Sequence, residues 1–145
     1  MATNAILDSS VVVALVTSEK YSDWSNNALL NHQYLHALDL SFYEVANSIR
    51  YKVSEKFDSK DAAAALRQAE KIMNLSTIHS FTEVLPEAFN KALELKIAVY
   101  DAAFLSLADK LDAKLLTLDQ KLAKKLEGTK YFSLIEYPNK KPIQT

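Results

Sequence analysis

The stretch YDAAFLSLADKLDAKLLTLDQKL, from Tyr100 to Leu122, decides the fold of this chain. From Ala102 to Ala108 every residue except Ser106 is apolar, and a helix that is apolar on nearly every side belongs in a protein interior. The mostly apolar run from Ala113 to Leu118 then has the pattern of a short strand that is buried on both faces. The stretch therefore predicts a buried helix followed by a central strand.

Two acidic residues stand at the borders of these elements. Asp101 lies at the front edge of the buried helix, where its carboxylate can face the helix N-terminus. Asp119 directly follows the strand and is placed to cap the next helix. A carboxylate at the rim of a core costs free energy unless a partner neutralises it. We therefore looked for other residues that share this rim.

Outward from this stretch, short apolar strands alternate with helical patterns. The expected strands are Ala5–Leu7, Tyr34–Leu38, Ser76–Phe81, Lys114–Leu118 and Tyr131–Ile135. The expected helices include Val11–Val16, Tyr21–Asn31, Asp61–Met73, Asp101–Ala108 and Gln120–Leu126. Two more are expected: one is capped by Asp39 or Ser41 and runs to about Val53, and the other is introduced by Thr82 and Pro86 and runs to about Lys96. The first helix carries mixed helix and strand signals, and an N-cap at Asp8 or Ser9 favours helix. Strands separated by helices predict an α/β fold, with a mainly parallel sheet covered on both faces.

Length and composition predict one globular domain. The 145 residues are 49% apolar and 24% charged, and the formal net charge is −1, so no overall positive field attracts a polyanion. The domain is expected to span residues 1–136. Residues 137–145, which include Pro138 and Pro142, are expected to form a frayed C-terminal tail.

Several classes of site are excluded by composition. Cysteine is absent, which rules out disulfides and thiol chemistry. The spacing of His32, His36 and His79 along the chain predicts no zinc site. A single glycine, Gly128, excludes glycine-rich phosphate loops. An aspartyl phosphatase would need a second acid two residues after Asp8, where the chain has serine.

The N-terminal segment lacks the pattern of a targeting sequence. No basic residue precedes Lys20, and Asp8 interrupts the apolar run, so no signal peptide is expected. No uncharged stretch has the length of a membrane span. We therefore expect a cytoplasmic protein that does not contact a membrane.

Three acids are expected at one edge of the sheet. Asp8 follows the first strand, Asp119 follows the fourth, and Glu44 lies about one turn into the helix after the second. In parallel sheets, ligands bind beyond the carboxyl ends of the strands, at the topological switch point. Each acid alone is explained as a cap or a solvated side chain. With Asp101 they make a set of four, for which capping is not a sufficient explanation.

Four motifs in this order resemble those of a known family. They are LDSS around Asp8, SFYEVANSIR around Glu44, YDAAFLSLADKL around Asp101 and LLTLDQKL around Asp119. The set resembles PIN-domain ribonucleases, and in particular the VapC-like toxins of VapBC toxin–antitoxin pairs. The resemblance implies a three-layer α/β/α sandwich around a mainly parallel sheet of four to five strands. It also implies an RNA substrate, an antitoxin protein partner and a homodimer.

The resemblance further implies that Mg²⁺ or Mn²⁺ serves cleavage of RNA phosphodiesters. The family's acidic quartet falls on Asp8, Glu44, Asp101 and Asp119, and its neighbouring polar positions fall on Ser9, Asn47 and Thr117. Hard divalent cations select carboxylate oxygens. We expect Asp8, Asp101 and Asp119 to bind metal directly or through water, and Glu44 to bind metal or orient the attacking water.

Some alternatives stay open from the sequence. Thr117 is equally explained as a core hydroxyl bonded to backbone. Four lysines could contact phosphates near the site, although such residues are more often simply solvated: Lys52, Lys121, Lys124 and Lys125. The chain could also be a module of the same fold that binds RNA or protein without catalysis.

Overall fold

Five parallel strands form one sheet in the computed structural model, which describes residues 3–140. The strands are β1 (Asn4–Leu7), β2 (Tyr34–Leu38), β3 (Thr77–His79), β4 (Lys114–Leu116) and β5 (Ile135–Glu136). Their order across the sheet is β3-β2-β1-β4-β5, and every pairing is parallel. The predicted parallel α/β sheet is confirmed.

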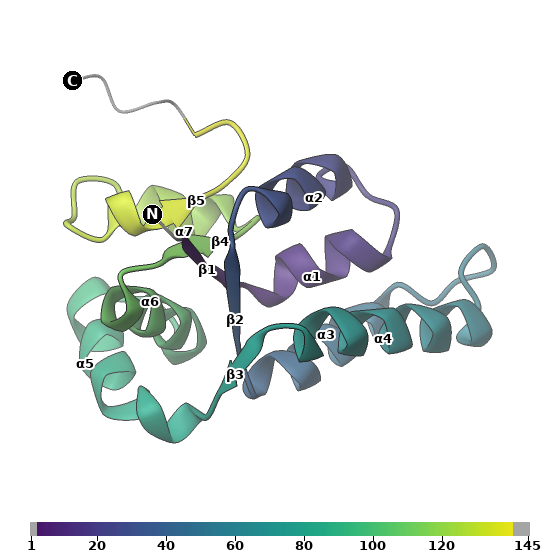
Figure 1. Cartoon of the computed structure of the whole chain (residues 1–145), viewed down its shortest axis with the longest axis horizontal. Helices are drawn as coiled ribbons and strands as arrows, with labels where there is room; N and C mark the ends of the chain where they lie inside the picture. The colour runs from purple at the N-terminus through teal and green to yellow at the C-terminus, as the bar shows by residue number, and fades with distance from the viewer. Residues whose placement is uncertain (1–2, 141–145) are drawn as a thin grey trace.

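Helices cover both faces of this sheet and complete the expected three layers (Figure 1). One face carries α1 (Ser9–Val16), α2 (Ser22–Leu30), α3 (Leu40–Tyr51) and α4 (Ser59–Asn74). The other face carries α5 (Leu85–Leu95), α6 (Val99–Leu111) and α7 (Gln120–Leu126). No helix within residues 3–140 is long and apolar enough to cross a membrane.

Side chains of the central strands alternate between the two cores, as the two-residue period of a strand requires. Ile6 and Leu115 pack under α5 to α7, whereas Leu7 and Leu116 pack under α1 to α4. All seven residues from Ala102 to Ala108 of α6 are buried. The prediction of a buried central helix is therefore confirmed.

The chain reverses its direction across the sheet between β1 and β4. It runs outward from β1 to β2 and β3, and then returns to place β4 on the other side of β1. The carboxyl ends of β1 and β4 are joined directly, because the amide of Asp8 donates to the carbonyl of Leu116 at 3.1 Å. This pair of strand ends is the topological switch point where open α/β sheets bind ligands.

The last expected strand, Tyr131–Ile135, is wrong over most of its length. Residues Phe132–Leu134 form a short 3-10 helix, and β5 contains only Ile135 and Glu136. The amides of Phe132 and Leu134 donate hydrogen bonds to the carbonyls of Thr129 and Tyr131, at 3.2 and 3.0 Å. These local bonds occupy the backbone groups that a longer strand would need.

The expected C-terminal tail begins with residues that pack on the domain. Tyr137 packs against the core beneath α5 to α7, and Pro138 is buried. The Lys140 ammonium donates to the carbonyls of Phe132 and Ile135 at 2.9 and 2.7 Å. Residues 137–140 are therefore held by contacts rather than frayed, and the rest of the expected tail, 141–145, lies outside the described residues.

Candidate active site

Asp8 occupies the N-cap position of α1 but does not cap it. Its side chain makes no capping hydrogen bond. Instead, carboxylate oxygen Oδ2 accepts hydrogen bonds from the hydroxyls of Ser10 and Thr117, at 2.8 and 2.7 Å. Burial raises the pKa of Asp8, the two hydroxyl bonds oppose that rise, and the nearby charge of Asp119 adds to it. The carboxylate of Asp8 is thus held by two hydroxyls and does not cap the helix.

The two hydroxyls that bind Asp8 are themselves fixed by the loop after β4. The amide of Leu118 donates to Ser10 Oγ, and the amide of Asp119 donates to Thr117 Oγ1, both at 3.1 Å. Each hydroxyl accepts one bond from the loop, so its own proton is directed to Asp8. The orientation of Asp8 is therefore coupled to the loop that carries Asp119. The Thr117 hydroxyl donates to the Asp8 carboxylate and accepts from the backbone amide of Asp119. Both interpretations of Thr117 from the sequence, a support for an acid and a hydroxyl bonded to backbone, therefore describe it.

Glu44 reaches the same edge from the first turns of α3. Its Oε1 accepts a hydrogen bond from the hydroxyl of Ser9 at 2.8 Å. Burial raises the pKa of Glu44, the Ser9 bond opposes that rise, and the charges of Asp8 and Asp101 add to it. Glu44 is therefore an electrostatic neighbour of two other acids of the set and is not simply solvated.

Asp101 lies in the first turn of α6, and its carboxyl group is partly buried. Burial, together with the charges of Asp8 and Asp119, raises its pKa from 3.8 to about 6, and the positive charge of Lys125 opposes the rise. A carboxyl that only complemented a helix dipole would be favoured in its charged form. Burial and the charges of Asp8 and Asp119 act in the opposite direction at Asp101.

Asp119 has two roles that the sequence presented as alternatives. Its Oδ1 accepts from the amides of Lys121 and Leu122, both at 3.0 Å, and so caps α7. Its charge also raises the pKa of Asp8 and Asp101. Capping fixes the carboxylate at the switch point without removing its negative charge.

The structure thus gathers the four predicted acids and two of the three predicted supporting residues. Asn47 is exposed, and it makes no hydrogen bond to the four acids within the described part of the chain. Ser10 takes the supporting role that was expected of Asn47. The only signal for it in the sequence is its place in the LDSS motif, directly after Asp8 and Ser9.

The donor set fits a hard divalent cation, although the side chains do not form a ready-made cage. Within residues 3–140, no group of three or more His, Asp or Glu side chains is arranged to hold a metal ion. Direct coordination by three acids would therefore need side-chain rotations. Mg²⁺ is usually bound through one or two carboxylates, with waters and substrate phosphates as its other ligands. The negative charges of the acids, which repel one another, also create a negative potential that attracts a cation.

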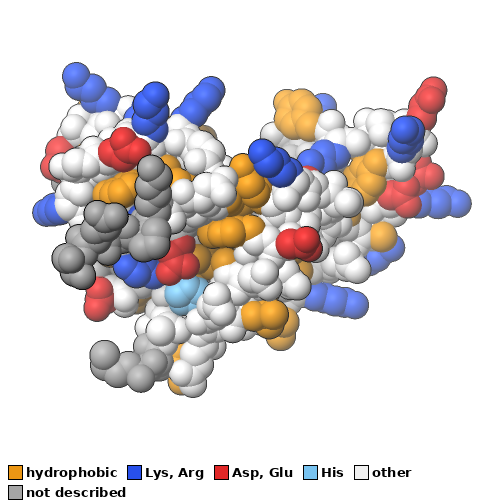
Figure 2. Space-filling model, turned by 90° about the horizontal axis from the view of Figure 1, so that it is seen from above, with side chains coloured by type: hydrophobic (Ala, Val, Ile, Leu, Met, Phe, Trp, Pro, Cys, Tyr) orange, Lys and Arg blue, Asp and Glu red, His pale blue; other side chains and the backbone are white. Residues whose placement is uncertain are grey.

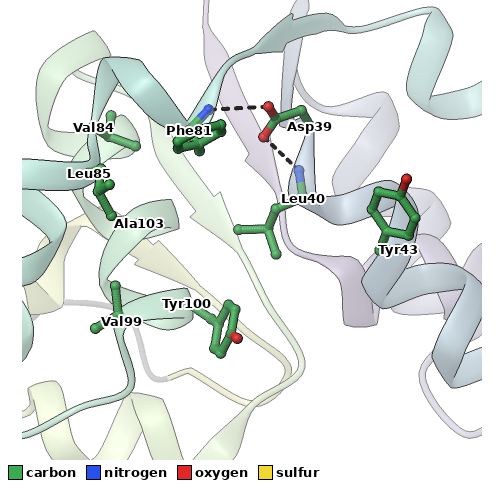
Figure 3. Close-up of a pocket in the computed structure, with 9 residues that line it drawn as sticks. All are labelled: Asp39, Leu40, Tyr43, Phe81, Val84, Leu85, Val99, Tyr100 and Ala103. Carbon is green, nitrogen blue, oxygen red and sulfur yellow. Dashed lines mark hydrogen bonds between the residues drawn. The ribbon is translucent and has the colours of Figure 1, made fainter.

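An apolar hollow of about 430 Å³ lies between the helices α3 and α6 (Figure 3). It is bounded by the starts of α3 and α6, by α5, and by the 3-10 helix η1 (Phe81–Glu83). Its lining residues are Asp39, Leu40, Tyr43, Phe81, Val84, Leu85, Val99, Tyr100 and Ala103. Tyr43 and Tyr100 directly precede Glu44 and Asp101 in the chain, so the same two helices, α3 and α6, carry lining residues of the hollow and two of the acids.

The arrangement can be compared with known proteins at the level of the whole domain. The family model described as PIN domain matches residues 5–127, which include all four acids. The chain belongs to the PIN-domain family. Ribonuclease VapC3 from Pyrobaculum aerophilum is 39% identical over 121 residues, which are 83% of this chain and 92% of that protein. This PIN domain is therefore VapC-like, as the four motifs predicted.

Solved structures support the same fold for this PIN domain. A toxin–antitoxin complex from Klebsiella pneumoniae contains a chain that superposes with a TM-score of 0.68 at 14% identity, covering 94% of this chain and 99% of that one. A protein of Pyrobaculum aerophilum superposes with a TM-score of 0.63 at 26% identity, covering 88% of this chain and 83% of that one.

Proposed function

We propose that this PIN domain is a metal-dependent ribonuclease that hydrolyses RNA phosphodiester bonds at Asp8, Glu44, Asp101 and Asp119. The observation that carries the proposal is the gathering of these acids at the switch point of the sheet, where their charges add to burial and raise the pKa values of Asp8, Glu44 and Asp101. Such clusters of perturbed carboxyls mark functional sites. The 39% identity with a protein named as a ribonuclease supports RNA as the substrate class.

Mg²⁺ or Mn²⁺ bound at this site would polarise a phosphoryl oxygen and lower the pKa of bound water. Asp8, Asp101 and Asp119 would hold it directly or through water. Ser10 and Thr117 keep the Asp8 carboxylate turned to the site, and the Ser9 hydroxyl positions Glu44. The raised pKa of Glu44 makes it a stronger base near neutral pH. Glu44 therefore binds the ion or accepts the proton of the attacking water.

Positive charge for the RNA backbone lies on α7, beside the acids. Lys121, Lys124 and Lys125 are exposed on this helix, and Lys125 is close enough to Asp101 to lower its pKa. Lys52, in contrast, is paired with Glu19 at 2.8 Å. Lysine and arginine side chains are scattered over the face seen in Figure 2 rather than gathered into one large patch. We therefore place phosphate contacts on α7.

A panel of end-labelled RNAs incubated with Mg²⁺, with Mn²⁺ or with EDTA tests the proposed activity. We expect cleavage of at least one RNA with either ion and none with EDTA, because the acids repel phosphate when no cation neutralises them. RNA binding without cleavage under all conditions would instead establish a non-catalytic binding module of the same fold. The proposed place of action is the cytoplasm, where such a ribonuclease meets its substrates.

The proposed protein partner is an antitoxin. The support is the similarity to a toxin–antitoxin complex, together with an apolar groove of about 290 Å³ between α3 and α4 that includes Ile49, Val53 and Leu66. Expression of this chain should arrest growth, and co-expression of the antitoxin should restore it. Normal growth during expression of cleavage-competent protein would contradict the toxin role without affecting the nuclease assignment.

We also propose a homodimer, formed through an apolar stripe along η1 and α5. Phe81, Leu85, Phe89 and Leu93 recur every fourth residue and are 52%, 47%, 53% and 65% exposed. Contiguous exposed apolar side chains of this kind mark interaction surfaces.

Phe89→Lys is therefore expected to convert the dimer into a monomer, because burial of an unpaired charge in an interface costs several kcal/mol. Sedimentation velocity measures the change. Leu75→Lys is the matched control, since Leu75 is 84% exposed but lies at the end of α4, away from the stripe. The proposal fails if Phe89→Lys has the same sedimentation coefficient as the wild type, or if Leu75→Lys alone dissociates the dimer.

A further inference from the structure

Three exposed aromatic side chains line the apolar hollow between α3 and α6. Tyr43, Tyr100 and Phe81 are 84%, 62% and 52% exposed. They come from α3, α6 and η1, and Figure 3 shows their rings apart from one another around the hollow. Val84 and Ala103, which are 1% and 8% exposed, give the hollow a buried apolar floor. The faces of the three rings are therefore available to a flat ligand.

The charge at the hollow favours a base over a phosphate. Among the nine described residues that line it, the only charged one is Asp39. Its Oδ1 and Oδ2 accept hydrogen bonds from the amides of Leu40 and Phe81, at 2.7 and 3.3 Å, and these bonds fix the carboxylate at the hollow (Figure 3). A fixed negative charge repels a phosphate, whereas the remaining lone pairs of a carboxylate can accept from N–H groups at the edge of a base.

The two tyrosines are chain neighbours of two acids of the proposed nuclease site. Tyr43 precedes Glu44 and Tyr100 precedes Asp101, so the Cα atoms of each pair are about 3.8 Å apart. Glu44 and Asp101 are in turn close enough for the charge of Asp101 to raise the pKa of Glu44. A phosphodiester bound at these acids carries a nucleoside on either side. A base next to the scissile phosphate is therefore within reach of the hollow.

We propose that the hollow binds one unstacked base of single-stranded RNA next to the scissile phosphate, and that Tyr43 and Tyr100 supply aromatic faces for this base. The proposal rests on the nuclease function proposed above. Stacking on aromatic side chains accepts any base, because every base has a π-face. Single strands, loops and bulges offer unstacked bases, whereas a duplex holds its bases inside the helix. The substrate of this PIN domain is accordingly unpaired RNA.

The hollow borders the stripe that is proposed for the homodimer. Phe81 and Leu85 belong to both surfaces, but Tyr43 and Tyr100 line only the hollow, and Phe89 lies only on the stripe. Substitutions of the two tyrosines therefore test base binding without altering a residue of the stripe.

Fluorescence of 2-aminopurine measures the stacking directly. A short single-stranded RNA that carries one 2-aminopurine, placed at each position in turn, is titrated with protein in Ca²⁺, which takes oxygen ligands as Mg²⁺ does. We expect the wild type to quench the fluorescence strongly at one or two positions and to cause no change in the matching duplex. Tyr43→Ala and Tyr100→Ala should each weaken this complex by about tenfold. Tyr43→Phe and Tyr100→Phe keep the rings and should bind as the wild type does.

Tyr51→Ala is the matched control for Tyr43→Ala. Tyr51 lies on the same helix, α3, and is 75% exposed, but it does not line the hollow. RNA binding by Tyr51→Ala should therefore equal that of the wild type. An equal loss of affinity in Tyr51→Ala would show that exposed aromatic rings contribute to binding wherever they lie, and would overturn the proposal.

Cleavage kinetics in Mg²⁺ separate this proposal from the nuclease assignment. For an RNA that the wild type cleaves, Tyr43→Ala and Tyr100→Ala should raise KM by about tenfold and have much less effect on kcat. Normal binding and cleavage in both variants would overturn the base site and leave the nuclease assignment intact. Quenching at particular positions without any cleavage would support the base site and remove the nuclease assignment. If the two variants change only the sedimentation coefficient or antitoxin binding, the hollow belongs to a protein interface and the proposal is wrong.

Discussion

Asp101→Asn is expected to reduce RNA cleavage by this PIN domain by about 100-fold or more, because it removes a carboxylate that stabilises charge at the reacting centre. The side chain of Asp101 accepts no capping bond at the start of α6, whose N-cap is Ala98. Its loss should therefore leave the circular dichroism spectrum unchanged. Asp8→Asn and Asp119→Asn should have similar effects on cleavage. The asparagine introduced by Asp119→Asn would still cap α7, since asparagine and aspartate cap equally well.

Asp109→Asn is the matched control for this result. Asp109 lies on the same helix as Asp101 but is exposed, and it pairs with Lys91 at 3.5 Å. First-order cleavage rates of one labelled RNA in Mn²⁺ measure the difference between the two variants. Wild-type rates in any purified Asp8, Asp101 or Asp119 variant would remove that residue from the proposed site.

The second large effect concerns stability with and without metal. In EDTA at about pH 8, Asp101→Asn should melt at or above the temperature of the wild type, because the substitution removes a charge that Asp8 and Asp119 repel. Mn²⁺ should stabilise the wild type by roughly 2.7 kcal/mol at a hundredfold excess over Kd. For a chain of this size that is about 8 °C. The variant should lose most of this shift.

The pH dependence follows from the direction of the Asp101 shift. Its folded pKa of about 6 exceeds the reference value of 3.8, so the folded protein binds more protons than the unfolded chain in this window. The stability that proton binding by Asp101 gives to the folded state is fully present below about pH 4 and is lost as the pH rises through about 6. At this partly exposed position, solvent screening leaves a contribution on the order of 1 kcal/mol.

Thermal melts in EDTA and in millimolar Mn²⁺, at two pH values on either side of this window, show whether Asp101 is repelled by the other acids or only complements the dipole of α6. If Asp101 only complements the dipole of α6, Asp101→Asn should melt below the wild type in EDTA and show the same Mn²⁺ shift. That pair of results would contradict the repulsion on which the proposed metal site rests.

The sequence predicted the acids because their positions depend on local rules. Asp8 and Asp119 directly follow short apolar strands, and parallel strands bring their carboxyl ends to one edge of the sheet. The apolar run of α6 similarly required burial, whatever its neighbours. To predict these features, only the order of strands and helices along the chain has to be known.

Features that depend on long-range contacts could not be predicted in this way. Ser10 supports Asp8 because a loop 108 residues away donates to its hydroxyl. His36 and His79 are 43 residues apart and meet only through the pairing of β2 with β3. Asn47 shares a helix face with Glu44, but it lies one turn farther from the sheet edge, about 4.5 Å along the axis, and stays in solvent.

A Mn²⁺ titration that follows ion binding and RNA cleavage in the same samples tests the central claim most directly. In the wild type, cleavage should be absent in EDTA and should rise with the fraction of protein that has bound Mn²⁺. Asp8→Asn should lose both binding and cleavage, whereas Asp109→Asn should keep both. Cleavage that persists in EDTA, or Mn²⁺ binding that is unchanged in Asp8→Asn, would contradict a metal-dependent site built on these four acids.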